Sequence, residues 1–282
     1  MGSASGRCGL SGSYIIKKLP TSKKGMEALF VKGIFFMTMD LLRRFDRICD
    51  TGNVIAGYTS GLCGEWIQER FEHLAEHLNI ESSMMIMANQ KHTDQVRVIG
   101  IEDVGYGVNI PHDNNYADAL ITDQAGIMLC VHTADCVPVV LLDPVKKVVG
   151  IAHSGWVGTA KRITGKTVKK MIEEYKCRPE DIICGIGPYN HSCCYEVGED
   201  VLECFRESFS DIECEILFCK KGNEGKYLLD LGAAVSLSLQ QEGVKLENIH
   251  DEGHCTYHTS TFSSWRRTGD KKKQILTYIM LQ

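Results

Sequence analysis

Short apolar runs fill the middle of this sequence, each three to six residues long and separated from the next by polar or glycine-containing segments. Runs of that length are typical of strands and are too short for most helices. We assign strands to six of them: 84–87, 96–101, 120–122, 127–132, 137–142 and 148–153. Any fold for this chain must therefore contain a sheet.

Helical periodicity lies on both sides of these runs. Apolar residues recur on one side of segment 65–78, and a stronger apolar seam begins near Gly158 and continues to Tyr175. The later pattern predicts strands at 182–186, 216–219 and 227–230, and helices at 201–209 and 231–241. Because these elements alternate without a regular repeat or a central linker, we predict an α+β fold of the α/β type. It is a single domain with mixed β-sheets sandwiched by helices.

The N-terminal segment differs from the rest in composition. Residues 1–12 are rich in Gly and Ser, and four lysines follow before the first acidic residue, Glu27. We expect residues 1–25 to be a flexible leader or a remnant of expression, and residues 26–282 to form the domain.

Charge and composition exclude several classes of protein. The 282 residues carry a formal net charge of −5, which argues against a surface that coats nucleic acid. No apolar run approaches the roughly 18 residues of a membrane span, and no secretory segment precedes a cleavage site. The 13 cysteines are too few for a disulfide scaffold. We therefore expect a cytoplasmic protein with reduced thiols and with neither nucleic acid nor membrane as a partner.

A cysteine and a histidine stand at the ends of two predicted strands. Cys136 precedes the strand at 137–142, and His153 ends the strand at 148–153. If both lie at one sheet edge, a thiolate and an imidazole converge there, which suits either a Cys/His nucleophilic pair or a zinc site. The other interpretation is that Cys136 packs as a small apolar residue, as free cysteines often do.

The segment around these two residues, ADALITDQAGIMLCVHTADCVPVVLLDPVKKVVGIAHSGWVGT (117–159), resembles the core of the laccase-domain family. Members of that family were first described as polyphenol oxidoreductases and are now regarded as zinc-dependent purine nucleoside phosphorylases. Three more segments agree in order: NQKHTDQV (89–96), GIGPYNHSCCYEVG (185–198), and Cys255-Thr256 followed by FSSWRR (262–267).

The resemblance implies a set of metal ligands and a reaction. The family's ligands fall on His92, Cys136 and His153, which are also the expected catalytic residues. Three protein ligands leave a fourth position open, as in a catalytic zinc site, where the pKa of a bound water can fall to about 7. The implied substrates are inorganic phosphate and the purine nucleosides adenosine, inosine, guanosine and methylthioadenosine. The implied products are a free base and ribose 1-phosphate, with adenosine deamination as a second activity.

Two arginines and one aspartate are candidates for substrate or phosphate contact. The guanidinium groups of Arg266 and Arg267 match oxyanions well. The alternative is that either arginine merely solvates a C-terminal strand. Asp135 is the third candidate for substrate or phosphate contact. The alternative is that it orients His92 or His153.

The chain departs from the family pattern at two positions. Gly61 and Val157 stand where the family usually has Arg, which bears on phosphate affinity and substrate preference. The loop 102–118 is long and is either a lid over the site or a surface excursion.

Other motifs receive weaker interpretations. The H-x-x-E-H pattern of His73, Glu76 and His77 falls on the polar flank of its helix, so we expect a solvated face. Gly185–Pro188 lacks the downstream residues of a P-loop, so we expect a tight turn there.

Histidine and cysteine clusters near the C-terminal third have two interpretations. Segment 250–258 carries His250, His254 and His258, which either border the pocket or form a second metal site. The adjacent Cys193 and Cys194 have no expected function, and Cys255 is a possible neighbour of Cys136.

Three other functions compete with phosphorolysis. A His₂Cys set also suits copper, as in a polyphenol oxidase (laccase), although none of the ten histidines is two residues from another, the spacing expected of multicopper centres. A metal-free hydrolase would use Cys136 and His153 and leave His92 aside. A zinc-stabilised interaction module would need a closed coordination sphere.

Overall fold

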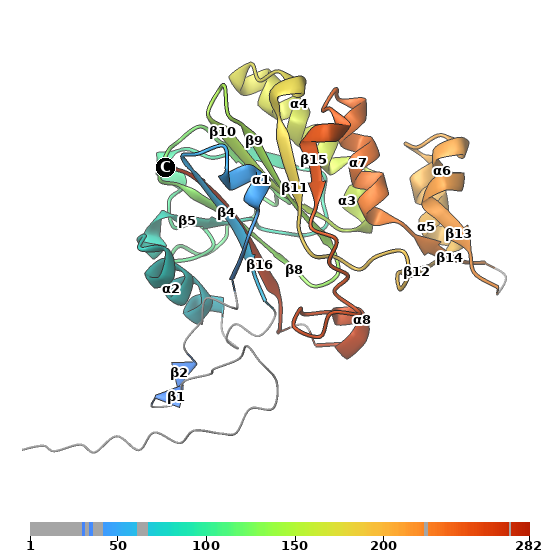
Figure 1. Cartoon of the computed structure of the whole chain (residues 1–282), viewed down its shortest axis with the longest axis horizontal. Helices are drawn as coiled ribbons and strands as arrows, with labels where there is room; N and C mark the ends of the chain where they lie inside the picture. Colours follow the sequence, from blue (N-terminus) through green and yellow to red (C-terminus); the bar gives the residue numbers. More distant parts are fainter. Residues whose placement is uncertain (1–29, 32–33, 36–41, 61–66, 223–224, 271) are drawn as a thin grey trace, which may run out of the picture.

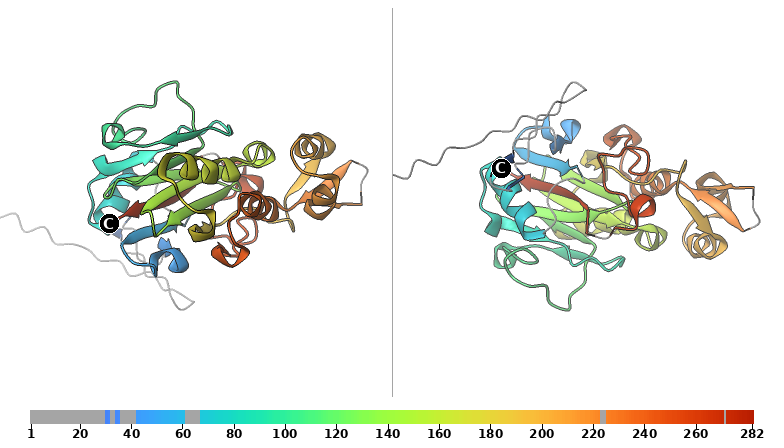
Figure 2. Two further views of the ribbon diagram at one scale, coloured as in Figure 1. Left: turned by 90° about the horizontal axis from the view of Figure 1, so that it is seen from above. Right: turned by 90° about the horizontal axis from the view of Figure 1, so that it is seen from below.

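The two large β-sheets of the molecule pack against each other and carry helices on their outer faces (Figures 1 and 2). This arrangement comes from a computed structural model, which describes residues 30–31, 34–35, 42–60, 67–222, 225–270 and 272–282. The expected leader at 1–25, and Gly61, lie outside the described residues.

The first large sheet has six strands in the order β15-β11-β9-β10-β7-β6. Its members are β6 (Val96–Val98), β7 (Ala119–Thr122), β9 (Val137–Asp143), β10 (Val148–Ser154), β11 (Ile183–Ile186) and β15 (Ile249–Asp251). The β6/β7 and β11/β15 pairs are parallel, whereas the central pairs are antiparallel, so the sheet is mixed.

The second large sheet has five strands in the order β3-β4-β16-β8-β5. Its members are β3 (Leu42–Arg44), β4 (Val54–Thr59), β5 (Met85–Met87), β8 (Met128–Thr133) and β16 (Ile275–Leu281). The β5/β8 pair is parallel and the rest are antiparallel. A two-stranded pair, β1 (Phe30–Val31) and β2 (Ile34–Phe35), precedes it in the chain.

Helices cover the outer face of each sheet. On the five-stranded side, α2 (Ile67–Leu78) packs its buried Phe71 and Leu74 against the sheet. On the six-stranded side lie α3 (Trp156–Ala160), α4 (Ile163–Tyr175) and α7 (Leu231–Gln241). The other helices are α1 (Asp46–Cys49), α5 (Glu199–Arg206), α6 (Asp211–Leu217) and α8 (Trp265–Thr268).

A small subregion stands at the end of the molecule away from α2 (Figure 1). It joins α5 and α6 to a three-stranded sheet in the order β12-β14-β13. Those strands are β12 (Glu196–Gly198), β13 (Phe218–Lys220) and β14 (Lys226–Leu229).

The continuous apolar runs of the sequence follow from this layering. In β9, Val139 and Leu141 face the helices, whereas Val140 and Leu142 face the other sheet. Both faces of the strand are therefore covered, and all seven residues are buried. A strand covered on both faces needs apolar side chains at every position instead of at alternate ones. The prediction of a single α+β domain with mixed sheets between helices is confirmed.

Three predicted elements differ from the structure. The seam from Gly158 to Tyr175 is broken into α3 and α4, because Arg162 between them has a left-handed backbone with φ 58°. Its guanidinium reaches the carbonyl of Ser208 and lies over the Phe209 ring, contacts that bend the chain here. The run at 96–101 forms strand only to Val98, and a 3₁₀ helix (Ile101–Asp103) follows.

The third difference concerns the predicted strand at 216–219. Ile216 lies in α6, and strand begins at Phe218. The cause is a capping box, in which the Ser210 hydroxyl accepts from the Glu213 N–H while the Glu213 carboxylate accepts from the Ser210 N–H.

No helix among the described residues is long and apolar enough to cross a membrane.

The packing between the sheets generates a stability prediction. Leu129 on β8 is fully buried in the core that both sheets share. We expect Leu129→Ala to lower the free energy of unfolding by about 2–5 kcal/mol, because it removes buried methyl groups and leaves a cavity. Urea unfolding measures this loss, and Ile216→Ala, 68% exposed on α6, is the control, with an expected change within about 0.5 kcal/mol. Equal losses in the two variants would contradict the assignment of the core.

Candidate active site

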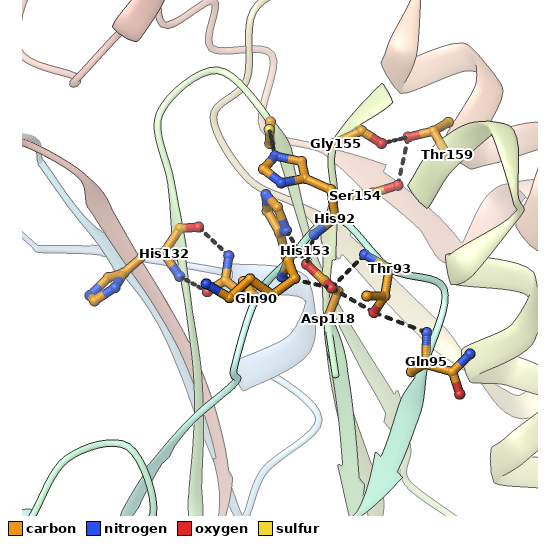
Figure 3. Close-up of polar contacts among 12 residues, drawn as sticks. Gln90, His92, Thr93, Gln95, Asp118, His132, His153, Ser154, Gly155 and Thr159 are labelled. Carbon is orange, nitrogen blue, oxygen red and sulfur yellow. Dashed lines mark hydrogen bonds and ion pairs between the residues drawn. The ribbon is translucent and has the colours of Figure 1, made fainter. Parts of the chain in front are cut away.

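Three segments bring His92, Cys136 and His153 together at one end of the sheets. His153 lies on β10 opposite Pro138 of β9, so the antiparallel register places it beside Cys136, which immediately precedes β9. His92 arrives on the loop between β5 and β6 (Figure 3). The Cys136 Sγ and His92 Nε2 atoms are 3.9 Å apart, and the two histidine rings meet edge to face with centroids 4.9 Å apart. One ligand atom from each residue lies within 4.8 Å of the others.

A fully buried carboxylate, that of Asp118, holds two of these ligands in place (Figure 3). It accepts a hydrogen bond from His153 Nδ1 at 2.7 Å. It also accepts the backbone N–H groups of Lys91, His92 and Thr93 and the Thr93 hydroxyl. With Nδ1 donating to Asp118, the Nε2 atom of His153 keeps its lone pair for a metal or a proton.

A glycine makes the close approach of the ligands possible. A Cβ atom on Gly155 would lie 2.6 Å from Cδ2 of His92 and 3.1 Å from Sγ of Cys136. Any side chain at this position would push the ligands apart, so Gly155 is required by contact and not by backbone conformation.

The charges of the three groups depend on one another. Burial raises the pKa of the Cys136 thiol, but the charge of His153 and hydrogen bonds from both histidines outweigh burial and lower this pKa to about 6. Burial lowers the pKa of His153, but the Cys136 thiolate and the Asp118 carboxylate raise it to about 9. Burial likewise opposes ionisation of Asp118, and its bonds from His153 and Thr93 bring its pKa down to about 2. Without metal, the site therefore holds a thiolate beside an imidazolium.

The ligand set opens into a cavity of about 700 Å³. That volume falls within the range of small-molecule sites. Besides the three ligands, the lining includes aromatic, amide and basic side chains: Asn89, Gln90, His112, His132, Trp156, Tyr195, Trp265 and Arg266.

The two candidate arginines have different surroundings, although both lie on α8 and not on a strand. Arg266 lines the cavity, where its guanidinium lies over the Tyr195 ring at 5.0 Å and donates to the Glu196 carbonyl. Arg267 does not line it, and its guanidinium donates instead to the carbonyls of Thr256, Tyr257 and Phe262. Arg266 thus lines the same cavity as the three ligands, whereas Arg267 holds together the loop before α8 through its hydrogen bonds to backbone carbonyls.

Asp135 lines the cavity but does not orient either histidine. Its carboxylate accepts from the Thr256 hydroxyl and from the Arg266 backbone N–H, each at 2.6 Å. The expectation that Asp135 orients His92 or His153 is therefore wrong, because Asp118 has that position.

The chain is similar to known proteins over most of its length. The model of the family described as multi-copper polyphenol oxidoreductase laccase matches residues 56–282. The chain belongs to this laccase family. The Bacillus subtilis protein named purine nucleoside phosphorylase YlmD is 32% identical over 74% of each chain. A protein from an unknown prokaryotic organism, named adenosine deaminase RL5, is 33% identical over 73% of this chain and 78% of its own length.

A solved structure of the laccase family has the same fold. That of YlmD from Geobacillus stearothermophilus superimposes with a TM-score of 0.75 at 27% identity, covering 82% of this chain and 93% of that one. The sequence-based assignment to this family is confirmed.

Sequence reasoning missed three residues of this laccase-family site. Asp118 lies at the start of the family-like segment, but its partners at 91–93 are distant in the sequence. The Gln90 side chain both donates to the carbonyl and accepts from the N–H of His132, and so ties the His92 loop to β8 (Figure 3). Burial, then the charge of Arg70, lower the pKa of His132 to about 3, so its ring is neutral where it lies beside Phe71 of α2, with ring centroids 6.0 Å apart.

The remaining sequence candidates have clear positions. Glu76 and His77 are exposed on α2, as expected of a solvated face, with His73 half-buried beside them. Val157 lies on α3 and does not line the cavity. Segment 102–118 borders the cavity through Gly107 and His112.

The later histidine and cysteine candidates lie away from the cavity. Among the described residues, neither His250, His254 nor His258 lines it. Cys255 does not line the cavity and belongs with Cys193, Cys194 and His258 to a separate group.

Asp118 generates the prediction for this site. We expect Asp118→Asn to weaken zinc binding about 10- to 100-fold, because the amide is a poorer acceptor for His153 and for the loop at 91–93. Competition with a chromophoric chelator measures the affinity. Asp123→Asn, an exposed carboxylate just after β7, should bind zinc as the unaltered protein does. Unchanged affinity in Asp118→Asn would contradict the role assigned to this carboxylate.

Proposed function

We propose that this protein is a zinc-dependent purine nucleoside phosphorylase that also deaminates adenosine. Its substrates would be inorganic phosphate with adenosine, inosine, guanosine or methylthioadenosine, and its products a free base and the 1-phosphate of the sugar. The observation that carries the proposal is the His92–Cys136–His153 set opening into a cavity of about 700 Å³ that also contains Arg266. Relatives named purine nucleoside phosphorylase and adenosine deaminase support it.

The donor set fits zinc. Two imidazoles and a low-pKa thiol are ligands that zinc accepts, and the 3.9 Å between Cys136 Sγ and His92 Nε2 is near the tetrahedral edge of about 3.6 Å that zinc bond lengths give. When bound here, zinc would act as a Lewis acid with one open position. The protein supplies the rest of the site.

The cavity walls suit a nucleoside and an anion. Trp156, Tyr195 and Trp265 offer aromatic faces on which a purine can stack. Arg266 would hold phosphate against the sugar, and its contact with the Tyr195 ring supports this role by restricting its guanidinium plane.

The competing functions have less support. Copper oxidation of phenols in multicopper proteins relies on several coppers with histidine ligands, whereas the described residues contain one set with two histidines and another with one. A metal-free hydrolase would use the Cys136 thiolate and His153 imidazolium, but it leaves unexplained why His92 is held against both. An interaction module would not need a cavity beside the metal ligands.

Phosphate-dependent base release tests the proposal. Zinc-loaded protein incubated with each nucleoside should release free base only when phosphate is present, and adenosine should also yield inosine or hypoxanthine. Chromatography of the bases measures both activities. We expect Cys136→Ala to lose the metal of this site and both activities, because one of three ligands is removed, whereas Cys219→Ala, exposed on β13, should retain them. Base release that is independent of phosphate would refute phosphorolysis, and an active Cys136→Ala would refute the site.

Arg266 is tested separately. We expect Arg266→Gln to raise KM for phosphate about 10- to 100-fold, because a hydrogen bond to a charged group contributes about 1.5–3 kcal/mol. Steady-state kinetics at varied phosphate concentration measures the change. Arg206→Gln, on the exposed face of α5, is the control and should have an unaltered KM. A KM for phosphate that stays the same in Arg266→Gln would remove this residue from the phosphate site.

A further inference from the structure

A second group of metal-binding side chains lies outside the cavity. Cys193 and Cys194 come from the loop between β11 and β12, and Cys255 and His258 from the loop after β15. One ligand atom from each of the four lies within 4.8 Å of the other three. More than sixty residues of chain separate the two loops, so the group is assembled by the fold.

The distances within the group are those of a tetrahedron around a metal. Zinc bonds of about 2.3 Å to sulfur and 2.0–2.1 Å to nitrogen give S···S edges of about 3.8 Å and S···N edges of about 3.6 Å. The Cys193 and Cys255 sulfurs are 3.8 Å apart, and Nδ1 of His258 is 3.6 Å from the Cys193 sulfur. The Cys194 sulfur is 3.9 Å from the same Nδ1 atom. A disulfide would require sulfurs about 2.05 Å apart, so Cys193 and Cys255 are not joined by one.

Backbone hydrogen bonds hold the two loops in register independently of any metal. Tyr189 and Cys255 form a parallel bridge, in which Thr256 N–H donates to the Tyr189 carbonyl and Tyr189 N–H donates to the His254 carbonyl.

We propose that Cys193, Cys194, Cys255 and His258 bind one zinc ion in a closed structural site, separate from the ligand set of the cavity. Four protein ligands complete a tetrahedron and leave no position for substrate, which distinguishes this site from the three-ligand set. The thiolate-rich donor set favours zinc over magnesium or calcium, which prefer oxygen.

The site would cross-link two loops that form part of the cavity wall. Tyr195 follows Cys194 directly and lines the cavity. Thr256 follows Cys255 directly and donates to Asp135, the residue before Cys136. A zinc ion here therefore fixes the position of Tyr195 and Asp135 without touching substrate, and this inference does not depend on the proposed reaction.

Zinc content per chain tests the proposal. Protein loaded with zinc, desalted and measured by elemental mass spectrometry should contain two zinc ions per chain. Cys136→Ala should retain one, the double variant Cys193→Ser/Cys194→Ser should retain one, and the combination of all three substitutions should retain none. The matched control Cys204→Ser/Cys219→Ser removes two cysteines outside both groups and should keep two.

This set of variants tests the two metal sites independently of each other. If the cavity set does not bind zinc, the unaltered protein and Cys136→Ala both contain one ion, which Cys193→Ser/Cys194→Ser loses, and the second site stands. If the double variant has the zinc content of its Cys204→Ser/Cys219→Ser control, the second site is refuted. The same conclusion follows if peptide mapping of the purified, unreduced chain finds Cys193 or Cys194 in a disulfide with Cys255.

Cobalt absorption provides a readout of the ligands themselves. Cobalt bound to three thiolates gives a stronger sulfur-to-metal charge-transfer band than cobalt bound to one, so Cys136→Ala should retain most of the band and the double variant should lose most of it. His258→Asn should weaken and shift the ligand-field bands, whereas His77→Asn, exposed on α2, should not. Identical spectra for His258→Asn and the unaltered protein would exclude His258 as a ligand.

Discussion

The buried carboxylate of Asp118 is the constraint on which the active site depends. A charged group without exposed surface is stable only when hydrogen bonds replace its lost hydration. Asp118 has five such donors, and four of them come from residues 91–93. The loop must therefore turn its N–H groups inward, and His92 accordingly has a left-handed backbone with φ 57°. The hydrogen bonds that stabilise the charged carboxylate thus position His92 and orient His153.

Asp118 can hold this position because the two sheets fix its surroundings. It stands just before β7, whose pairing with β10 continues to Ala152, and His153 N–H donates to the Asp118 carbonyl at 2.7 Å. The β9–β10 register then sets Cys136 beside His153. Cys136 and His153 lie at the ends of two strands whose residues are all buried, so a rigid core positions these two ligands. Preorganisation of this kind favours precise coordination geometry.

Sequence reasoning reached those parts of the structure that local patterns determine. Continuous apolar runs predicted β9 and β10 because both their faces are covered, and the family-like segments indicated His92, Cys136 and His153. It did not find β4 and β16 of the five-stranded sheet. These two strands pair with each other although more than two hundred residues separate them in the sequence. The apolar residues at 216–219 favour a strand, but the capping box of Ser210 begins a helix that includes Ile216. For Asp118, the residue type was visible but its partners exist only in the folded chain.

The two cysteine-containing groups show why ligand number and surroundings matter more than residue type. Adjacent cysteines lack the C-x₂-C spacing that makes a zinc site recognisable, and the ligands that complete the second group come from a distant loop. In that group a fourth side chain closes the tetrahedron, which leaves no room for reaction. Beside His92 and Cys136 lies Gly155, which has no side chain to offer as a ligand and whose small size lets the existing ligands meet. The three ligands line the same cavity as Arg266 and the aromatic side chains, so a molecule that completed the coordination would come from that cavity.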